Sequence, residues 1–141
     1  MAMSPTLPPA IPDRLLMIYN ADEGFFNALN DWAHKIFSPE TYDCRLCRYT
    51  YGVTGMLTAW KTFLERQPFP TIFFHRPEFR KAFPDYRDVA LPLILVEKDG
   101  HIDVLLLADD IGETGGIVPL MELVQSRLAS WQPVGPGPVG T

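Results

Sequence analysis

Residues 91–107 read LPLILVEKDGHIDVLLL, two apolar runs separated by a polar turn signal. The first run, Leu91–Val96, and the second, Ile102–Leu107, have the length and apolar content of β-strands. The Asp-Gly pair at 99–100 suits the positive φ values of a type I′ turn, so Lys98–His101 is predicted to be a hairpin turn. The stretch therefore predicts two consecutive antiparallel strands late in the chain.

Two further strands and four helices are predicted around this hairpin. Leu15–Tyr19 and Thr71–His75 are short continuous apolar runs, which are typical of strands buried on both faces of a sheet. Apolar residues at helical spacing predict helices over 22–37, 56–67, 77–83 and 117–128, the last capped by Thr114 or Gly116. The predicted order is β-α-α-β-α-β-β-α with about four strands, an α/β fold.

The composition predicts one globular domain with two tails. The chain has 141 residues, of which 47% are hydrophobic and 21% charged, and these values are typical of a folded domain. Residues 1–12 are rich in proline and 132–141 in proline and glycine, so both are predicted to be disordered tails around a domain over 13–131.

Charge and hydropathy exclude several classes of partner. The net charge of −5 argues against binding to nucleic acid through phosphate contacts and against a basic membrane-surface protein. The sequence contains no apolar run long enough to span a membrane, and its start lacks the basic region of a signal peptide. We therefore expect a cytoplasmic protein whose partner is another protein or a small thiol.

The predicted element order resembles the thioredoxin-like fold, a three-layer α/β/α sandwich. A cis-proline opens the third strand of that fold, and Pro92 opens the third predicted strand here. The resemblance covers about Arg14–Leu128. The sequence leaves open whether the Leu91–Pro92 peptide bond is cis.

The chain also resembles a group of short bacterial proteins with a displaced Cys-x-x-Cys pair. The residues that carry this second resemblance are Tyr19-Asn20-Ala21-Asp22, Ser38-Pro39-Glu40-Thr41-Tyr42-Asp43-Cys44-Arg45-Leu46-Cys47, Thr50-Tyr51-Gly52 and His75-Arg76. It implies no activity.

Cys44-Arg45-Leu46-Cys47 is the one concentrated group of reactive side chains in the sequence. A Cys-x-x-Cys spacing lets two sulfurs close a reversible disulfide, and the positive charges of Arg45 and Arg48 favour the thiolate. Thioredoxin-like oxidoreductases carry their pair at the start of the first helix, whereas here the pair follows the end of the predicted helix over 22–37. The first hypothesis is a thiol–disulfide couple in which Cys44 is the attacking thiol.

Two other interpretations of the cysteines stay open. Zinc or copper could be bound by Cys44 and Cys47 together with His34 or His75, because one Cys-x-x-Cys supplies only two of the four usual ligands. His75 ends the second predicted strand, at the carboxyl edge where α/β sheets bind ligands. Alternatively, both cysteines are small hydrophobic residues without a special role.

Two charged stretches suggest other roles. Arg76–Arg87 is locally basic and could dock a partner or an anion without any thiol chemistry, although such a stretch is more often a solvated face. Asp109 and Asp110, with Glu113, are interpreted as a complement to a helix dipole rather than a cation site. The sequence contains no Walker-type phosphate loop.

Overall fold

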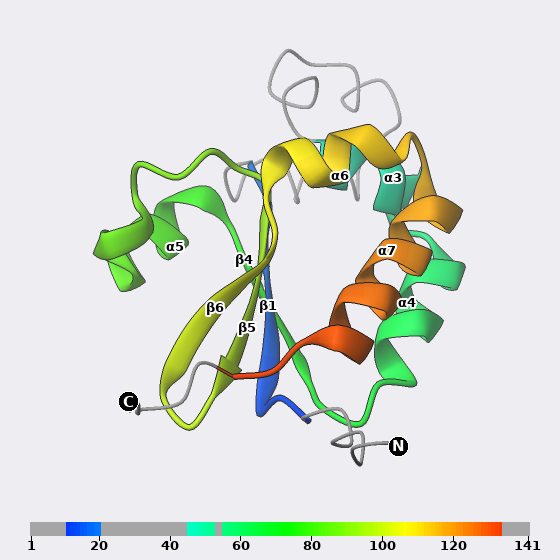
Figure 1. Ribbon diagram of the computed structural model, residues 1–141. Helices are drawn as coiled ribbons and strands as arrows, with labels where there is room; N and C mark the ends of the chain where they lie inside the picture. The colour runs from blue at the N-terminus through cyan, green and yellow to red at the C-terminus, as the bar shows by residue number, and fades with distance from the viewer. Residues whose placement is uncertain (1–10, 21–44, 53–54, 134–141) are drawn as a thin grey trace, which may run out of the picture.

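The computed structural model describes residues 11–20, 45–52 and 55–133. Its main sheet has four strands in the order β4-β1-β5-β6, with helices on both faces (Figure 1). These strands are β1 (Arg14–Ile18), β4 (Thr71–Phe74), β5 (Leu93–Lys98) and β6 (His101–Leu106). β1 pairs in parallel with β4 and antiparallel with β5, and β5 pairs antiparallel with β6. The predicted α/β class is confirmed.

Apart from Arg14 at its start, β1 is fully buried, as its apolar run predicts. All five residues from Leu15 to Tyr19 are 0% exposed. Leu15 and Met17 belong to one hydrophobic core, and Leu16 and Ile18 belong to another. Because neighbouring residues of a strand point to opposite faces, the strand separates the interior into a first core and a second core.

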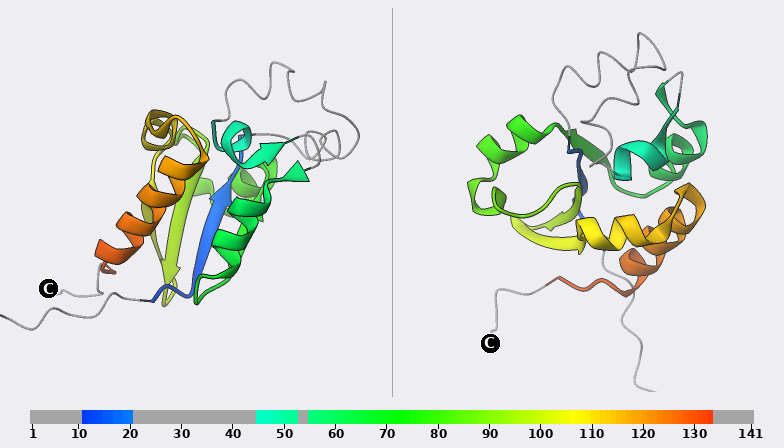
Figure 2. Two further views of the ribbon diagram at one scale, coloured as in Figure 1. Left: turned by 90° about the vertical axis from the view of Figure 1, so that its right-hand side faces the viewer. Right: turned by 90° about the horizontal axis from the view of Figure 1, so that it is seen from above.

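Different helices cover the two cores (Figure 2). The first core is covered by α4 (Thr58–Glu65) and α7 (Ile117–Ser130), and the second by α5 (Arg76–Ala82). The buried residues that these helices contribute are Trp60, Leu64, Leu120, Val124 and Leu128 to the first core and Phe79 to the second. Burying each large apolar side chain contributes roughly 1.5–3 kcal/mol, so these helices are held mainly by their apolar faces.

The predicted hairpin turn is confirmed, and the structure answers the open question about Pro92. Asp99 and Gly100 have φ values of 52° and 83°, which matches the type I′ geometry. The Leu91–Pro92 peptide bond is cis and directly precedes β5, whose first residue, Leu93, pairs with Ile18.

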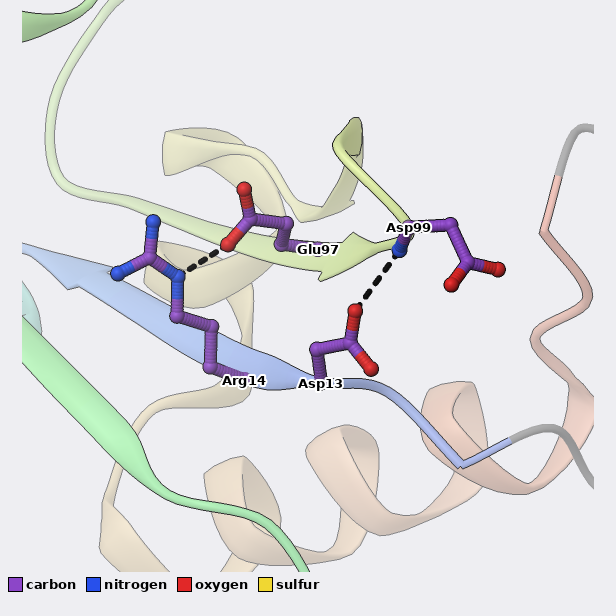
Figure 3. Close-up of polar contacts among 4 residues, drawn as sticks. All are labelled: Asp13, Arg14, Glu97 and Asp99. Carbon is purple, nitrogen blue, oxygen red and sulfur yellow. Dashed lines mark hydrogen bonds and ion pairs between the residues drawn. The ribbon is translucent and has the colours of Figure 1, made fainter.

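The start of β1 is fastened to the end of β5 by charged side chains (Figure 3). The Asp99 backbone N–H donates to Asp13 Oδ2 at 2.8 Å, and Arg14 forms an ion pair with Glu97. The hydrogen bond from Asp99 holds the pKa of Asp13 below its usual value, with Lys98 adding a smaller electrostatic contribution.

One strand prediction is wrong in its burial. We expected Thr71–His75 to be buried on both faces, but β4 lies at the edge of the sheet and Phe73 is 41% exposed. An apolar run indicates that the side chains of a strand pack against helices. It does not show whether the strand lies in the centre or at the edge of the sheet.

Several short elements were not predicted. The helix α6 (Ala108–Thr114) follows β6. Its first turn holds Asp109 and Asp110, which complement the helix dipole there, whereas Glu113 lies near its other end. A two-stranded sheet pairs β2 (Tyr51–Gly52) with β3 (Gly55–Met56), and a 3-10 helix, η2, covers Pro84–Tyr86. α7 begins after Gly116, one of its two predicted caps.

Within the described part of the chain, no helix is long and apolar enough to cross a membrane. The predicted helix over 22–37 and most of both predicted tails lie outside the described residues.

Candidate functional site

The second cysteine lies on a short helix, α3 (Arg45–Thr50), that packs into the first core. Cys47 is 2% exposed and Leu46 is 0% exposed. The helix lies beside α6 (Figure 1), and Tyr49 Oη donates to the carbonyl oxygen of Gly112 on α6 at 3.2 Å. The sulfur of Cys47 is therefore surrounded by the interior of the protein.

A buried polar contact fixes the end of α3 to the end of β1. Tyr19 Oη and Thr50 Oγ1 lie 3.0 Å apart, and Thr50 Oγ1 also donates to the carbonyl oxygen of Leu46 at 2.6 Å. Because the threonine hydroxyl has one proton, Tyr19 is the donor in the first contact. The contact places α3 at the carboxyl end of β1.

The other residues at this edge come from β4 and β5. The carboxyl ends of β1 and β4 meet because these strands are parallel, and Arg76 Nη1 donates to Asn20 Oδ1 at 2.8 Å. β5 runs the opposite way, so its start and the buried Pro92 before it lie at the same edge. Four parts of the chain therefore lie at the carboxyl ends of β1 and β4: α3, the residues after β1, the start of α5 and the cis-proline.

Cys47 is disulfide-bonded. Cys44, the only other cysteine in the sequence, lies outside the described residues. Arg48 is exposed in the last turn of α3 whereas Cys47 is buried, so their side chains leave the helix in different directions. The structure does not describe the side chain of Arg45.

His75 occupies the N-cap of α5 and is engaged with Glu78. The His75 backbone N–H donates to Glu78 Oε1 at 3.1 Å, and the His75 ring contacts the same oxygen through Nδ1. These hydrogen bonds, the backbone one first, hold the pKa of Glu78 below its usual value. His75 therefore has a structural role at the start of this helix.

The predicted metal ligands are only partly placed. Cys47 packs in the first core, whereas the helix that His75 caps packs on the second core. His34 and Cys44 lie outside the described residues, and among those described no three His, Cys, Asp or Glu side chains form a group that could hold a metal ion. Metal binding stays a prediction.

The basic stretch over 76–87 lies on α5 and η2. Arg80, Lys81 and Arg87 are exposed, but so are the carboxylates of Asp85, which lies between Lys81 and Arg87, and of Asp88, which follows Arg87. The surface is therefore mixed in charge, as expected for a solvated face.

Sequence reasoning did not assign a role to Tyr19 or Thr50. The sequence nevertheless pointed to them. Three of the pieces that carry the resemblance to short bacterial proteins are Tyr19-Asn20-Ala21-Asp22, Thr50-Tyr51-Gly52 and His75-Arg76. In the structure those pieces meet: Tyr19 contacts Thr50, and Arg76 contacts Asn20. Their convergence makes this edge the candidate functional site.

Comparison with known proteins adds no relative, because no protein-family model, no curated protein and no solved structure matches the chain.

Proposed function

We propose that the chain is a thioredoxin-like protein that uses Cys44 and Cys47 as a thiol–disulfide redox couple. The observation that carries this proposal is the disulfide at Cys47, on a helix fixed to the carboxyl end of β1. A Cys-x-x-Cys spacing lets two sulfurs close a reversible disulfide.

The sheet supports the thioredoxin-like part of the proposal. In that fold the first two strands are parallel neighbours, and the third and fourth are added antiparallel on the other side of the first. The order β4-β1-β5-β6, with β4 as the second main strand, has the same arrangement. The cis peptide bond before β5 is a second, independent point of similarity.

The reaction would proceed in two exchange steps with a disulfide R–S–S–R, where R is a small thiol or a protein. The Cys44 thiolate attacks one substrate sulfur, which forms a mixed disulfide and releases one R–S⁻. The Cys47 sulfur, after losing its proton, then attacks Cys44, which releases the second R–S⁻ and leaves a disulfide in the protein. Two electrons pass from the protein to the substrate, and the two thiol protons neutralise the released thiolates.

The burial of Cys47 supports one assignment of the two roles. At 2% exposure, Cys47 is closed to an external disulfide and suits the second, internal step. Cys44 is therefore the attacking thiol in this proposal.

Glutathione disulfide tests the proposal. Reduced Cys47→Ser protein should accumulate a mixed disulfide with one glutathione, detected by intact-protein mass spectrometry. Reduced Cys44→Ser protein should react at least tenfold more slowly, because its remaining thiol is buried. Adding denaturant should make the two variants react equally.

Equal reactivity of the two folded variants, or faster labelling of Cys44→Ser, would contradict the assignment of roles. The wild-type protein distinguishes the alternatives: native mass spectra before and after reductant should show a gain of two hydrogens and no bound metal. A metal lost on denaturation would instead favour the zinc or copper hypothesis.

A further inference from the structure

The outer edge of β4 presents unpaired main-chain groups. Leu15 N–H donates to the Pro70 carbonyl at 2.9 Å and Tyr19 N–H to the Phe74 carbonyl at 3.0 Å, so the even-numbered residues of this strand face β1. The N–H and C=O groups of Thr71 and Phe73 therefore point outward. No strand in the described ranges pairs with this side of the sheet.

β4 lacks the features that usually protect an edge strand. Its sequence is Thr-Ile-Phe-Phe, with no charge and no proline within the strand, and Phe73 is 41% exposed. The other edge strand, β6, carries Asp103, and a charged side chain of this kind discourages pairing. The two edges of the sheet thus differ in their capacity to add a strand.

A cavity of about 510 Å³ lies between this edge and α4. Residues that line it include Lys61, Leu64, Glu65, Phe69, Thr71 and Phe73. The interior of the cavity is mainly apolar, and the two charged residues, both exposed, come from the neighbouring helix. An apolar side chain from a molecule docked on the edge could enter the cavity.

We propose that the occupant is a second copy of this chain, paired through β4 about a two-fold axis. Opposite residues of an antiparallel pair share one face of the sheet, so Thr71 would lie opposite Phe73 of the partner subunit. That register uses all four outward main-chain groups in hydrogen bonds. It also places each exposed Phe73 ring at the mouth of the partner's cavity, which Thr71 lines.

The charges beside the cavity favour a second copy over an unrelated segment. Lys61 and Glu65 both line the cavity, and their spacing of four residues on α4 places them on one face of this helix. A two-fold axis reverses the direction of the helix, so each lysine faces a glutamate of the other subunit. The surface is thus complementary to itself in charge as well as in main-chain hydrogen bonding.

Sedimentation velocity over a range of protein concentrations, with reductant present, tests the proposal. The wild-type protein should approach twice the 15.9 kDa mass of one chain as concentration rises. Phe73→Asp should abolish the dimer, because each subunit would place a carboxylate in an apolar cavity. Val104→Asp is the matched control, since Val104 is 42% exposed on β6, and it should leave the dimer intact.

A charge exchange tests the register without touching the strand. Lys61→Glu should raise the dimer dissociation constant roughly tenfold, because the facing pairs become repulsive. Combining it with Glu65→Lys restores opposite charges and should recover the wild-type value. A wild-type protein that stays monomeric at all concentrations, a dimer that survives Phe73→Asp, or a double variant as weak as Lys61→Glu would overturn the proposal.

Discussion

Thr50 and Tyr19 form a hydrogen-bonded pair in an otherwise apolar interior, and both are 0% exposed. They are 31 residues apart in the sequence. Because Thr50 gives its proton to Leu46 and accepts that of Tyr19, each hydroxyl has a partner. The pair joins the cysteine-bearing helix α3 to the central strand.

Removing one hydroxyl of this pair should be costly. Thr50→Val keeps the shape of the side chain but leaves the buried Tyr19 hydroxyl without this acceptor, so we expect a loss of about 1–3 kcal/mol in the free energy of unfolding. Urea denaturation measures this loss. Tyr19→Phe should cost a similar amount, and the double variant should cost less than the sum of the two. Strict additivity would contradict the coupling.

The turn glycine should be less replaceable than the cap glycine of α7. Gly100 has a φ of 83°, whereas Gly116 has a φ of 172°, and a Cβ would meet no atom within 4 Å at either position. Gly100→Ala should therefore lower the free energy of unfolding by about 1–2 kcal/mol through backbone strain alone. Gly116→Ala should cost less than half as much. Equal losses in urea denaturation would rule out strain at the turn as the cause.

Glu78 should contribute to acid denaturation. Its pKa is held below the usual 4.5, first by the backbone N–H of His75, so its stabilising effect is complete above 4.5 and is lost as pH falls through the lowered value. Melting temperatures measured at decreasing pH should therefore fall less steeply for Glu78→Gln than for the wild type. Glu122→Gln removes the same charge from the exposed face of α7 and is the matched control.

An apolar substitution at Thr71 should raise the free energy of unfolding. Its Oγ1 is buried and has no hydrogen-bond partner, which is unfavourable for a hydroxyl. Thr71→Val replaces the hydroxyl with a methyl group of similar size, and we expect a gain of about 1 kcal/mol in urea denaturation at one fixed protein concentration. Thr71→Ser keeps the hydroxyl and loses the methyl group, so it should destabilise the protein. A loss of stability in Thr71→Val would contradict this account.

The parts of the fold that were predicted correctly depend on local patterns. The runs at 15–19 and 91–96 are long enough to identify strands, and Asp99-Gly100 identifies its own turn type because few residues tolerate positive φ. By contrast, α6 has only seven residues and one fully buried side chain, Ile111, which is too little for a recognisable apolar stripe.

The candidate site depends on contacts between distant parts of the sequence. The cysteine motif was visible at once, but the burial of Cys47 follows from packing against β1 and α6, which no local pattern encodes. In the same way, the contact between Asn20 and Arg76 joins residues 56 positions apart. The edge position of β4 was hidden for the same reason, since its neighbours in the sheet are set by the whole topology.

Because β1 divides the interior into two cores, local unfolding on one face of the sheet need not expose the other core. The packing of α5 is confined to the second core, so local unfolding of this helix would expose Phe79 and its neighbours on that face only. Cys47 would remain enclosed in the first core throughout such an event. Local unfolding of α5 can therefore expose apolar surface without giving access to the disulfide.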